Sequence, residues 1–215
     1  MGEETRALVA LSAALSSGSA ERVSEAMARA ARVAVPGEVE EVLLQSYLFL
    51  GYPAALSALA QWRELTGLPA PAAAEAEPRE GWERRGEWVC ARIYGDQYDR
   101  LRANVARLHP DLERWMVTEG YGKVLGRPGL ALEVRELCVV ALLAGLDAPR
   151  QLYAHLRGAL NAGADPAEVE EALRVASEVV PRARAEAAWS VWSMVRSRWE
   201  ARWGAPPGDA SEDVR

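Results

Sequence analysis

Residues 151–173 read QLYAHLRGALNAGADPAEVEEAL, and this stretch decides the fold class. Its leucines recur every four residues in the first half, which predicts an amphipathic helix. Asn161 and Gly163 both tolerate the left-handed conformation in which helices often end. Asp165 followed by a proline, with Glu168 three residues later, is typical of a capped helix start. The stretch therefore predicts a helix, a sharp turn and a second helix.

The rest of the 215-residue chain has the same helical character. Apolar residues recur at helical spacing, and the good helix formers Ala, Leu, Glu and Arg are abundant. Alternating runs of β-branched residues bounded by turn residues, which would indicate strands, are missing from the sequence. We therefore predict an all-α helical bundle. Half of the residues are hydrophobic, which is enough to bury a sizeable core.

Two parts of the chain resemble each other, residues 6–43 and residues 135–173. Both run Arg-x-Leu, an apolar helix, a short loop, a small-residue helix, a proline and then Glu-Val-Glu-Glu-x-Leu. The first helices match at an offset of 129 residues and the acidic motifs at an offset of 130. We predict an internal duplication, with the two three-helix units packed as a pseudo-twofold pair, because neither unit can close a core alone.

The duplication suggests a division of the chain into four parts. Residues 1–66 form the first repeat, and the Pro- and Ala-rich residues 67–81 form an exposed linker. Residues 82–203 form amphipathic lead-in helices and the second repeat. Residues 204–215 are expected to be a disordered tail.

Composition argues against several classes of function. The net charge is −6 and no basic block occurs, so we expect no nucleic-acid partner, because phosphate contacts dominate that affinity. No run approaches the roughly 18 apolar residues of a membrane span, and the N-terminus lacks the features of a signal peptide. Cys90 and Cys138 suggest no disulfide framework. We expect a cytoplasmic protein without a membrane partner.

An acid–base pair is the principal candidate for chemistry. His155 falls on the edge of the apolar stripe of its helix, and Glu136 lies in the preceding helix, 134–146, which is apolar nearly all round. A carboxylate that faces an imidazole fixes its tautomer and raises its basicity, which suits acid–base catalysis. Structural alternatives exist for both residues. His155 would then bind a backbone carbonyl at the core edge, and Glu136 would interact with the dipole of its helix from the first turn.

The run from Gly120 to Leu173 resembles the carboxymuconolactone decarboxylase family, which includes the alkylhydroperoxidase D-like proteins. The shared motifs are R-P-G-L, R-E-L at the start of the core helix, H-x-x-x-A, N-x-G and an acidic E-[IV]-x-E helix. The segment LLQSYLFLGYPAAL, residues 43–56, resembles a further family motif around G-[FY]-P-x-A. The resemblance implies an all-α fold of two alkylhydroperoxidase D-like repeats and an oligomeric assembly.

Two chemistries occur in the family that the chain resembles, and one spacing separates them. The peroxidase branch has a glutamate, a C-x-x-C motif and a histidine, which correspond here to Glu136, Ala148, Gln151 and His155. Both thiols are therefore missing, and peroxide reduction needs a nucleophilic thiolate and a resolving partner. Cys138 lies on a helix expected to be buried, where a structural role is favoured.

The resemblance then implies decarboxylase-like chemistry on a small carboxylated ring compound of the lactone type, with no metal or organic cofactor. His155 would deliver a proton to the enolate left by CO2, and Glu136 would orient His155. The residues expected to bind the substrate are Arg127, Tyr121 and Tyr153. Arg127 would hold the carboxylate with its planar fork, unless it is a solvated turn residue, and Arg157 is an alternative.

The first repeat lacks the pair, since Ala7 aligns with Glu136 and Glu25 aligns with His155. We therefore expect one active half per chain, completed by a tyrosine of the first repeat, Tyr47 or Tyr52. Two other functions stay open. One is an alkylhydroperoxidase D-like antioxidant protein without the C-x-x-C motif. The other is a non-catalytic member that binds a ligand or serves in assembly.

Four of the eight tryptophans lie in residues 188–203, AWSVWSMVRSRWEARW. Trp192, Trp199 and Trp203 fall within about 40° of one another on a helical wheel. Such a face is typical of a subunit interface, where tryptophan is enriched as a buried anchor. We predict a homo-oligomer, a dimer or trimer, with this helix near a contact. The alternative is that the first repeat covers the face within the same chain.

Overall fold

The computed structural model describes residues 1–72, 78–146 and 148–203. Within these ranges every regular element is helical, which confirms the predicted all-α fold. The elements are α1 (Glu3–Ser16), α2 (Ala20–Val33), α3 (Pro36–Gln45), α4 (Tyr47–Thr66), α5 (Arg79–Tyr94), the 3-10 helix η1 (Gly95–Gln97), α6 (Tyr98–Leu108), α7 (Pro110–Trp115), the π-helix η2 (Met116–Leu125), α8 (Leu132–Gly145), α9 (Pro149–Ala162), α10 (Pro166–Ser177) and α11 (Arg182–Trp203). The predicted disordered tail, residues 204–215, lies outside the described residues.

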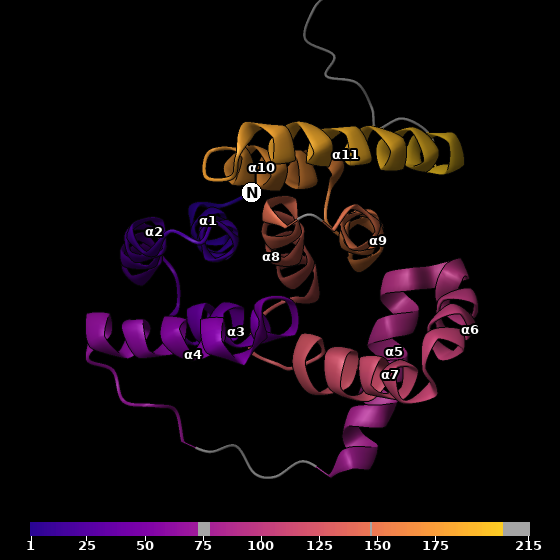
Figure 1. Cartoon of the computed structure of the whole chain (residues 1–215), viewed down its shortest axis with the longest axis horizontal. Helices are drawn as coiled ribbons and strands as arrows, with labels where there is room; N and C mark the ends of the chain where they lie inside the picture. Colours follow the sequence, from indigo (N-terminus) through magenta and orange to yellow (C-terminus); the bar gives the residue numbers. More distant parts are fainter. Residues whose placement is uncertain (73–77, 147, 204–215) are drawn as a thin grey trace, which may run out of the picture.

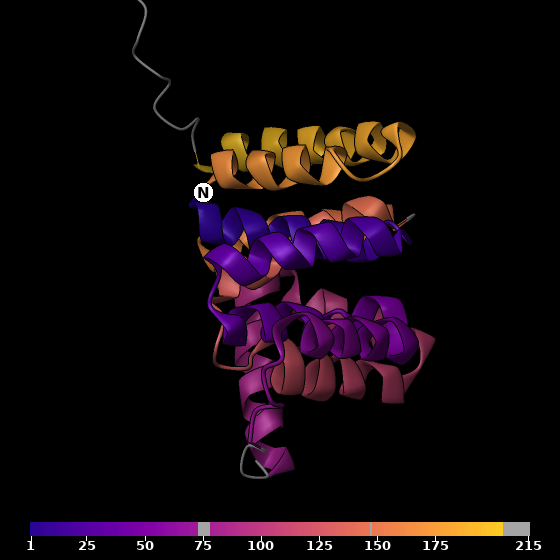
Figure 2. The same ribbon diagram turned by 90° about the vertical axis from the view of Figure 1, so that its left-hand side faces the viewer.

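The helices are stacked in layers (Figures 1 and 2). Helices α10 and α11 form one outer layer, α1, α2, α8 and α9 lie in the middle, and α3 and α4 lie on the other side. The segment from α5 to η2 lies beside α9 and beside the layer formed by α3 and α4. Helix α8 is the centre of the core, because residues 135–145 are all buried and it packs against α1, α9, α10 and α11.

The helix boundaries follow the offsets seen in the sequence. Helices α8, α9 and α10 begin 129, 129 and 130 residues after α1, α2 and α3. The predicted duplication and its pseudo-twofold axis remain predictions, because equal helix boundaries do not establish a symmetric arrangement. Helix α4 ends at Thr66, and α5 begins at Arg79, so that helix starts inside the predicted linker of residues 67–81.

The turn between α9 and α10 has the predicted form. Helix α9 ends at Ala162, and Gly163 follows with a φ of 120°, a value that favours glycine. Asp165 and Glu168 form a reciprocal capping box at the start of α10. The sequence pattern of residues 151–173 therefore predicted this turn and its two helices correctly.

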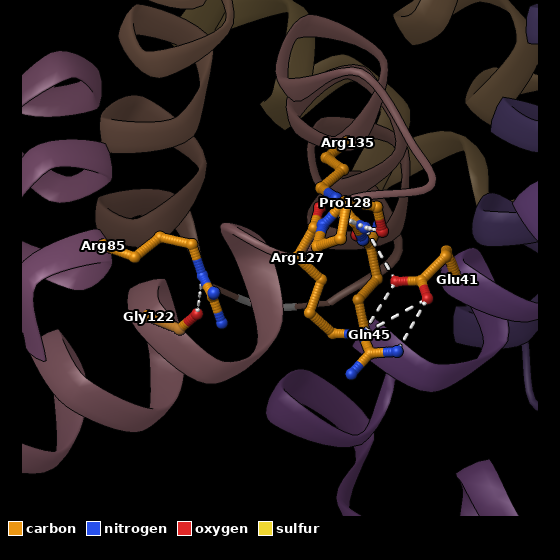
Figure 3. A network of polar contacts seen from close by, with 7 residues as sticks. All are labelled: Glu41, Gln45, Arg85, Gly122, Arg127, Pro128 and Arg135. Atoms are coloured by element: carbon orange, nitrogen blue, oxygen red, sulfur yellow. Dashed lines mark hydrogen bonds and ion pairs between the residues drawn. The ribbon is translucent and has the colours of Figure 1, made fainter. Parts of the chain in front are cut away.

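Helix α5 and the π-helix η2 touch backbone to backbone. A Cβ atom added to Gly86 of α5 would lie 2.0 Å from the carbonyl oxygen of Val117, and one added to Gly122 of η2 would lie 2.0 Å from that of Trp82. Arg85 adds a hydrogen bond of 2.7 Å from Nε to the carbonyl oxygen of Gly122 (Figure 3). Glycine is required on both sides of this crossing because any side chain would separate the helices.

Part of the tryptophan face of α11 is covered within the chain. Trp192 is buried, and its indole N–H donates to Glu170 of α10 over 3.1 Å. Trp189 is half-buried, and its N–H donates to Ser177 over 3.3 Å. Helix α10 therefore covers the part of this face that holds Trp189 and Trp192, and the predicted contact near α11 stays a prediction.

No single helix of the described residues is long and apolar enough to cross a membrane. Helices α3 and α4 reach that length and composition only together, as a pair bent by 118°.

The glycine crossing gives a direct test of the packing between α5 and η2. Gly122→Ala should lower the free energy of unfolding by about 1–3 kcal/mol, because the added methyl group overlaps a backbone carbonyl. For a chain of this size, thermal unfolding should then occur about 3–10 °C lower.

Gly120→Ala is the matched control, because no atom lies within 4 Å of its added Cβ in the same helix. Circular dichroism melts of the two variants should therefore differ. Equal melting temperatures for Gly120→Ala and Gly122→Ala would contradict the close crossing.

Candidate active site

Helix α8 carries two adjacent and fully buried charged residues, Arg135 and Glu136. The helix begins at Leu132, so Glu136 is its fifth residue and does not lie in the first turn. The alternative that Glu136 serves the helix dipole from the first turn is therefore wrong, and Glu133 occupies that place. A buried carboxylate needs a partner of another kind.

That partner is His155. Its Nδ1 lies 2.8 Å from Oε2 of Glu136, and only 5% of the histidine is exposed. When the carboxylate is ionised, Nδ1 carries the hydrogen and donates it, which leaves Nε2 with the lone pair. Oε1 of Glu136 has no hydrogen-bond partner among the described residues, so His155 is the carboxylate's one hydrogen-bond partner there.

Gly158 makes the space that the pair occupies. It lies on α9 one turn after His155, and an added Cβ would be 2.5 Å from Oε2 of Glu136. The same Cβ would be 2.8 Å from the side chain of Ile93 on α5. The absence of a side chain at Gly158 therefore admits both α5 and the carboxylate.

Phe49, which lies in the predicted first repeat, approaches the imidazole edge-on, with ring centroids 5.8 Å apart and planes at 79°. It lies just before a kink in α4 at Gly51, whose φ of 79° favours glycine. The sequence had suggested Tyr47 or Tyr52 for this contribution, but those two rings stack on each other at 5.0 Å. Phe49 was missed, although it is the only phenylalanine and lies in the G-[FY]-P segment.

Tyr121 is buried near Glu136, and its hydroxyl donates to the hydroxyl of Tyr94 over 3.0 Å. Burial raises the pKa of Tyr94 to about 12 and that of Tyr121 well above its ordinary value, and the charge of Glu136 adds to both effects. Both phenols therefore stay protonated at neutral pH. Tyr94 was not singled out from the sequence, because its partner is 27 residues away.

Arg127 is engaged by Glu41 of α3 (Figure 3). Its Nε lies 3.2 Å from both carboxylate oxygens and its Nη2 lies 3.1 Å from Oε1. Arg135 shares the same carboxylate over 2.7 Å and also donates to Gln45 over 3.2 Å. The structure thus places Arg127 in a network that joins α3 to the start of α8.

Tyr153 and Arg157, on α9, also have partners. The hydroxyl of Tyr153 accepts a hydrogen bond of 2.7 Å from Arg198, and Arg157 pairs with Asp96 over 3.2 Å. Both residues line two neighbouring cavities of about 490 and 650 Å³. Neither His155 nor Glu136 lines either cavity. The structure therefore brings the pair together and sets Tyr153 apart from it.

Both cysteines are buried and free. Burial raises the pKa of Cys90 and of Cys138 to about 12, so neither supplies a thiolate at neutral pH. Among the described residues, no group of three or more His, Cys, Asp or Glu side chains lies close enough together to hold a metal ion.

Comparison with known proteins agrees with the resemblance seen in the sequence. The profile described as "Carboxymuconolactone decarboxylase family" matches residues 110–193, a range that contains Glu136, His155 and Gly158. Peroxisomal protein 2 of Schizosaccharomyces pombe is 30% identical over 150 residues, which cover 66% of this chain and 68% of that protein. The chain belongs to the carboxymuconolactone decarboxylase family.

Proposed function

We propose that the protein is a cofactor-independent, decarboxylase-like lyase that acts on a small carboxylated ring compound of the lactone type. The observation that carries the proposal is the 2.8 Å contact between His155 and Glu136 in a buried setting. Such a carboxylate orients the imidazole and stabilises its protonated form, which is what a general acid–base residue needs. Membership of the family supports the reaction class but not the substrate.

In this proposal, the bond between the ring and the carboxylate carbon breaks and CO2 leaves. The electron pair moves into the substrate's own carbonyl group and forms an enolate. Protonated His155 then donates from Nε2 to the enolate carbon, while Glu136 holds Nδ1 and balances the positive charge. Water restores the proton to His155. Phe49 packs against the ring and helps to exclude water from it.

The substrate carboxylate needs a cation. Arg127 keeps 36% of its side chain exposed, so a substrate would have to share it with Glu41. Arg127 therefore remains a proposed carboxylate-binding residue, with its guanidinium group shared between the substrate and Glu41. Tyr121 and Tyr153 remain proposed residues of the substrate pocket. Tyr121 is the one that interacts electrostatically with Glu136 of the acid–base pair.

A non-catalytic, ligand-binding member of the family is the second candidate. It is favoured by the position of the pair, which does not line either of the two large cavities. A thiol peroxidase is disfavoured, because Ala148 and Gln151 occupy the two thiol positions and burial keeps Cys138 protonated. We propose a cytoplasmic location. A peroxisomal one is the alternative suggested by the name of the yeast relative.

We also propose that the protein forms a homo-oligomer, a dimer or trimer. A contact near α11 remains part of the proposal, and because Trp189 and Trp192 are covered within the chain, a second contact is proposed on α7. On helix α7, Leu112 is 48% exposed and Trp115 is 49% exposed. They are three residues apart and therefore lie on one face of the helix. Large apolar side chains that stay exposed in a single chain are typical of an interface.

The catalytic proposal predicts the behaviour of two substitutions. His155→Gln and Glu136→Gln should each lower the rate of CO2 release from carboxymuconolactone, or from the best substrate in a panel of lactone acids, by about 10²–10⁴-fold. His155→Gln removes the proton donor, and Glu136→Gln removes the charge that stabilises it. Thermal melts of each variant separate loss of chemistry from loss of fold.

The control is His109→Gln, which changes the other histidine of the chain at an exposed position. Its rate should match that of the unmodified protein. An unchanged rate in folded His155→Gln would contradict the acid–base role. Hydroperoxide turnover that disappears in Cys138→Ser would instead favour the thiol peroxidase.

The assembly proposal predicts a sedimenting species larger than the 23.4 kDa chain at micromolar concentration. Trp115→Glu should shift the protein toward the monomer, because a charge cannot be buried unpaired at an interface. Leu65→Glu, at an exposed apolar position on α4, is the control and should leave the oligomer unchanged. A monomeric native protein would refute the proposal.

A further inference from the structure

A cavity of about 650 Å³ lies between α5, α6, α9 and α11. This volume is typical of sites that hold a small organic molecule. Its walls carry apolar side chains from all four helices, Leu101 of α6 and Val191 and Met194 of α11 among them, and Tyr94 of α5 lines it as well. The cavity therefore offers an apolar surface large enough for one or two rings.

Three arginines line the same cavity, Arg100, Arg150 and Arg157, and no acidic side chain does. Arg157 is paired with Asp96 over 3.2 Å. Arg100 and Arg150 are exposed and have no hydrogen-bond or ion-pair partner among the described residues. In a chain whose net charge is −6, two unpaired cations beside one apolar cavity form a distinct local site for an anion.

The cavity is separate from the acid–base pair although both use α9. The side chains that α9 contributes to the cavity, at positions 149, 150, 153, 154 and 157, have the spacing of one helical face. His155 follows Ala154 by about 100° around the helix and faces Glu136 of α8. Ile93 lies between the two, since it lines the cavity and also packs beside Gly158 and the Glu136 carboxylate.

We propose that this cavity is a second binding site, which takes an organic anion with an apolar body of one or two rings and a single carboxylate. The apolar body lies against Leu101, Val191 and Met194. The carboxylate pairs with Arg100 and Arg150, whose guanidinium groups match its planar geometry. Tyr153, a proposed substrate-binding residue, lines this cavity too, but occupation of the cavity does not require His155 or Glu136 and is tested apart from the decarboxylase-like function.

Calorimetric titration with two isosteric probes tests the proposal. The native protein should bind 1-naphthaleneacetate at least about tenfold more tightly than 1-naphthaleneacetamide, because the two differ only in the charge that the arginines recognise. The double variant Arg100→Gln/Arg150→Gln should lose about tenfold in affinity for the acetate and little for the amide. Met194→Trp should weaken both probes by filling the apolar part of the cavity.

Two controls make the result specific. Arg29→Gln removes an exposed arginine from α2, on the opposite side of the molecule (Figure 1), and should not change binding. His155→Gln should also leave binding unchanged, because the site is separate from the pair. Circular dichroism verifies the fold of each variant, and loss of the two unpaired arginines breaks no described contact.

Several results would overturn the proposal. These are equal affinity for the two probes, no saturable binding of the acetate up to millimolar concentration, and unchanged binding in the double arginine variant. If Arg29→Gln lost as much affinity for the acetate as the double arginine variant, the loss would reflect the net charge of the protein and not this cavity. A loss of binding in folded His155→Gln would place the probe at the acid–base pair instead.

Discussion

The arrangement of the molecule depends on two opposite charges that are buried side by side in its central helix. Arg135 and Glu136 follow each other in α8, which is buried along residues 135–145. An unpaired charge in such a setting costs several kcal/mol, so each must meet a partner. Neighbouring side chains of a helix point about 100° apart, and their partners therefore come from different layers. Glu41 of α3 meets Arg135, and His155 of α9 meets Glu136 (Figure 3 shows the former).

The same constraint produces the candidate site. The Glu136 carboxylate fits into the core because Gly158 has no side chain. Among the described residues, His155 is the one that donates a hydrogen bond to this carboxylate. Phe49, two residues before the kink at Gly51, adds an aromatic wall from α4. A residue from the N-terminal part of the chain thus packs against an acid–base pair that lies in the C-terminal part. Burial removes competing water, which strengthens the electrostatic contact and restricts the imidazole to one orientation.

The sequence predicted the parts of this account that depend on neighbouring residues. The helical class and the capped turn after α9 follow from short-range spacing, and the pairing of His155 with Glu136 was expected from a helical hairpin and from the family resemblance, beside structural alternatives for both residues. It did not predict contacts between distant segments. Arg127 meets Glu41 across 86 positions, and the contact of Phe49 depends on the direction that the α4 kink gives the chain. Coverage of the α11 tryptophans by α10 likewise depends on packing between helices, which periodicity alone does not specify.

The tautomer of His155 tests the central claim most directly. Nitrogen-15 magnetic resonance at pH 8, where an ordinary imidazole is neutral, distinguishes hydrogen on Nδ1 from hydrogen on Nε2. His109 is an internal reference, because its Nδ1 accepts a hydrogen bond from the backbone of Asp111 and its hydrogen must lie on Nε2. The account predicts the opposite tautomer for His155, with hydrogen on Nδ1, and loss of that preference in Glu136→Gln. A neutral His155 with hydrogen on Nε2 and none on Nδ1 would contradict the account, since Nδ1 could not then donate to Glu136 and Nε2 could not take up the proton that it delivers to the substrate.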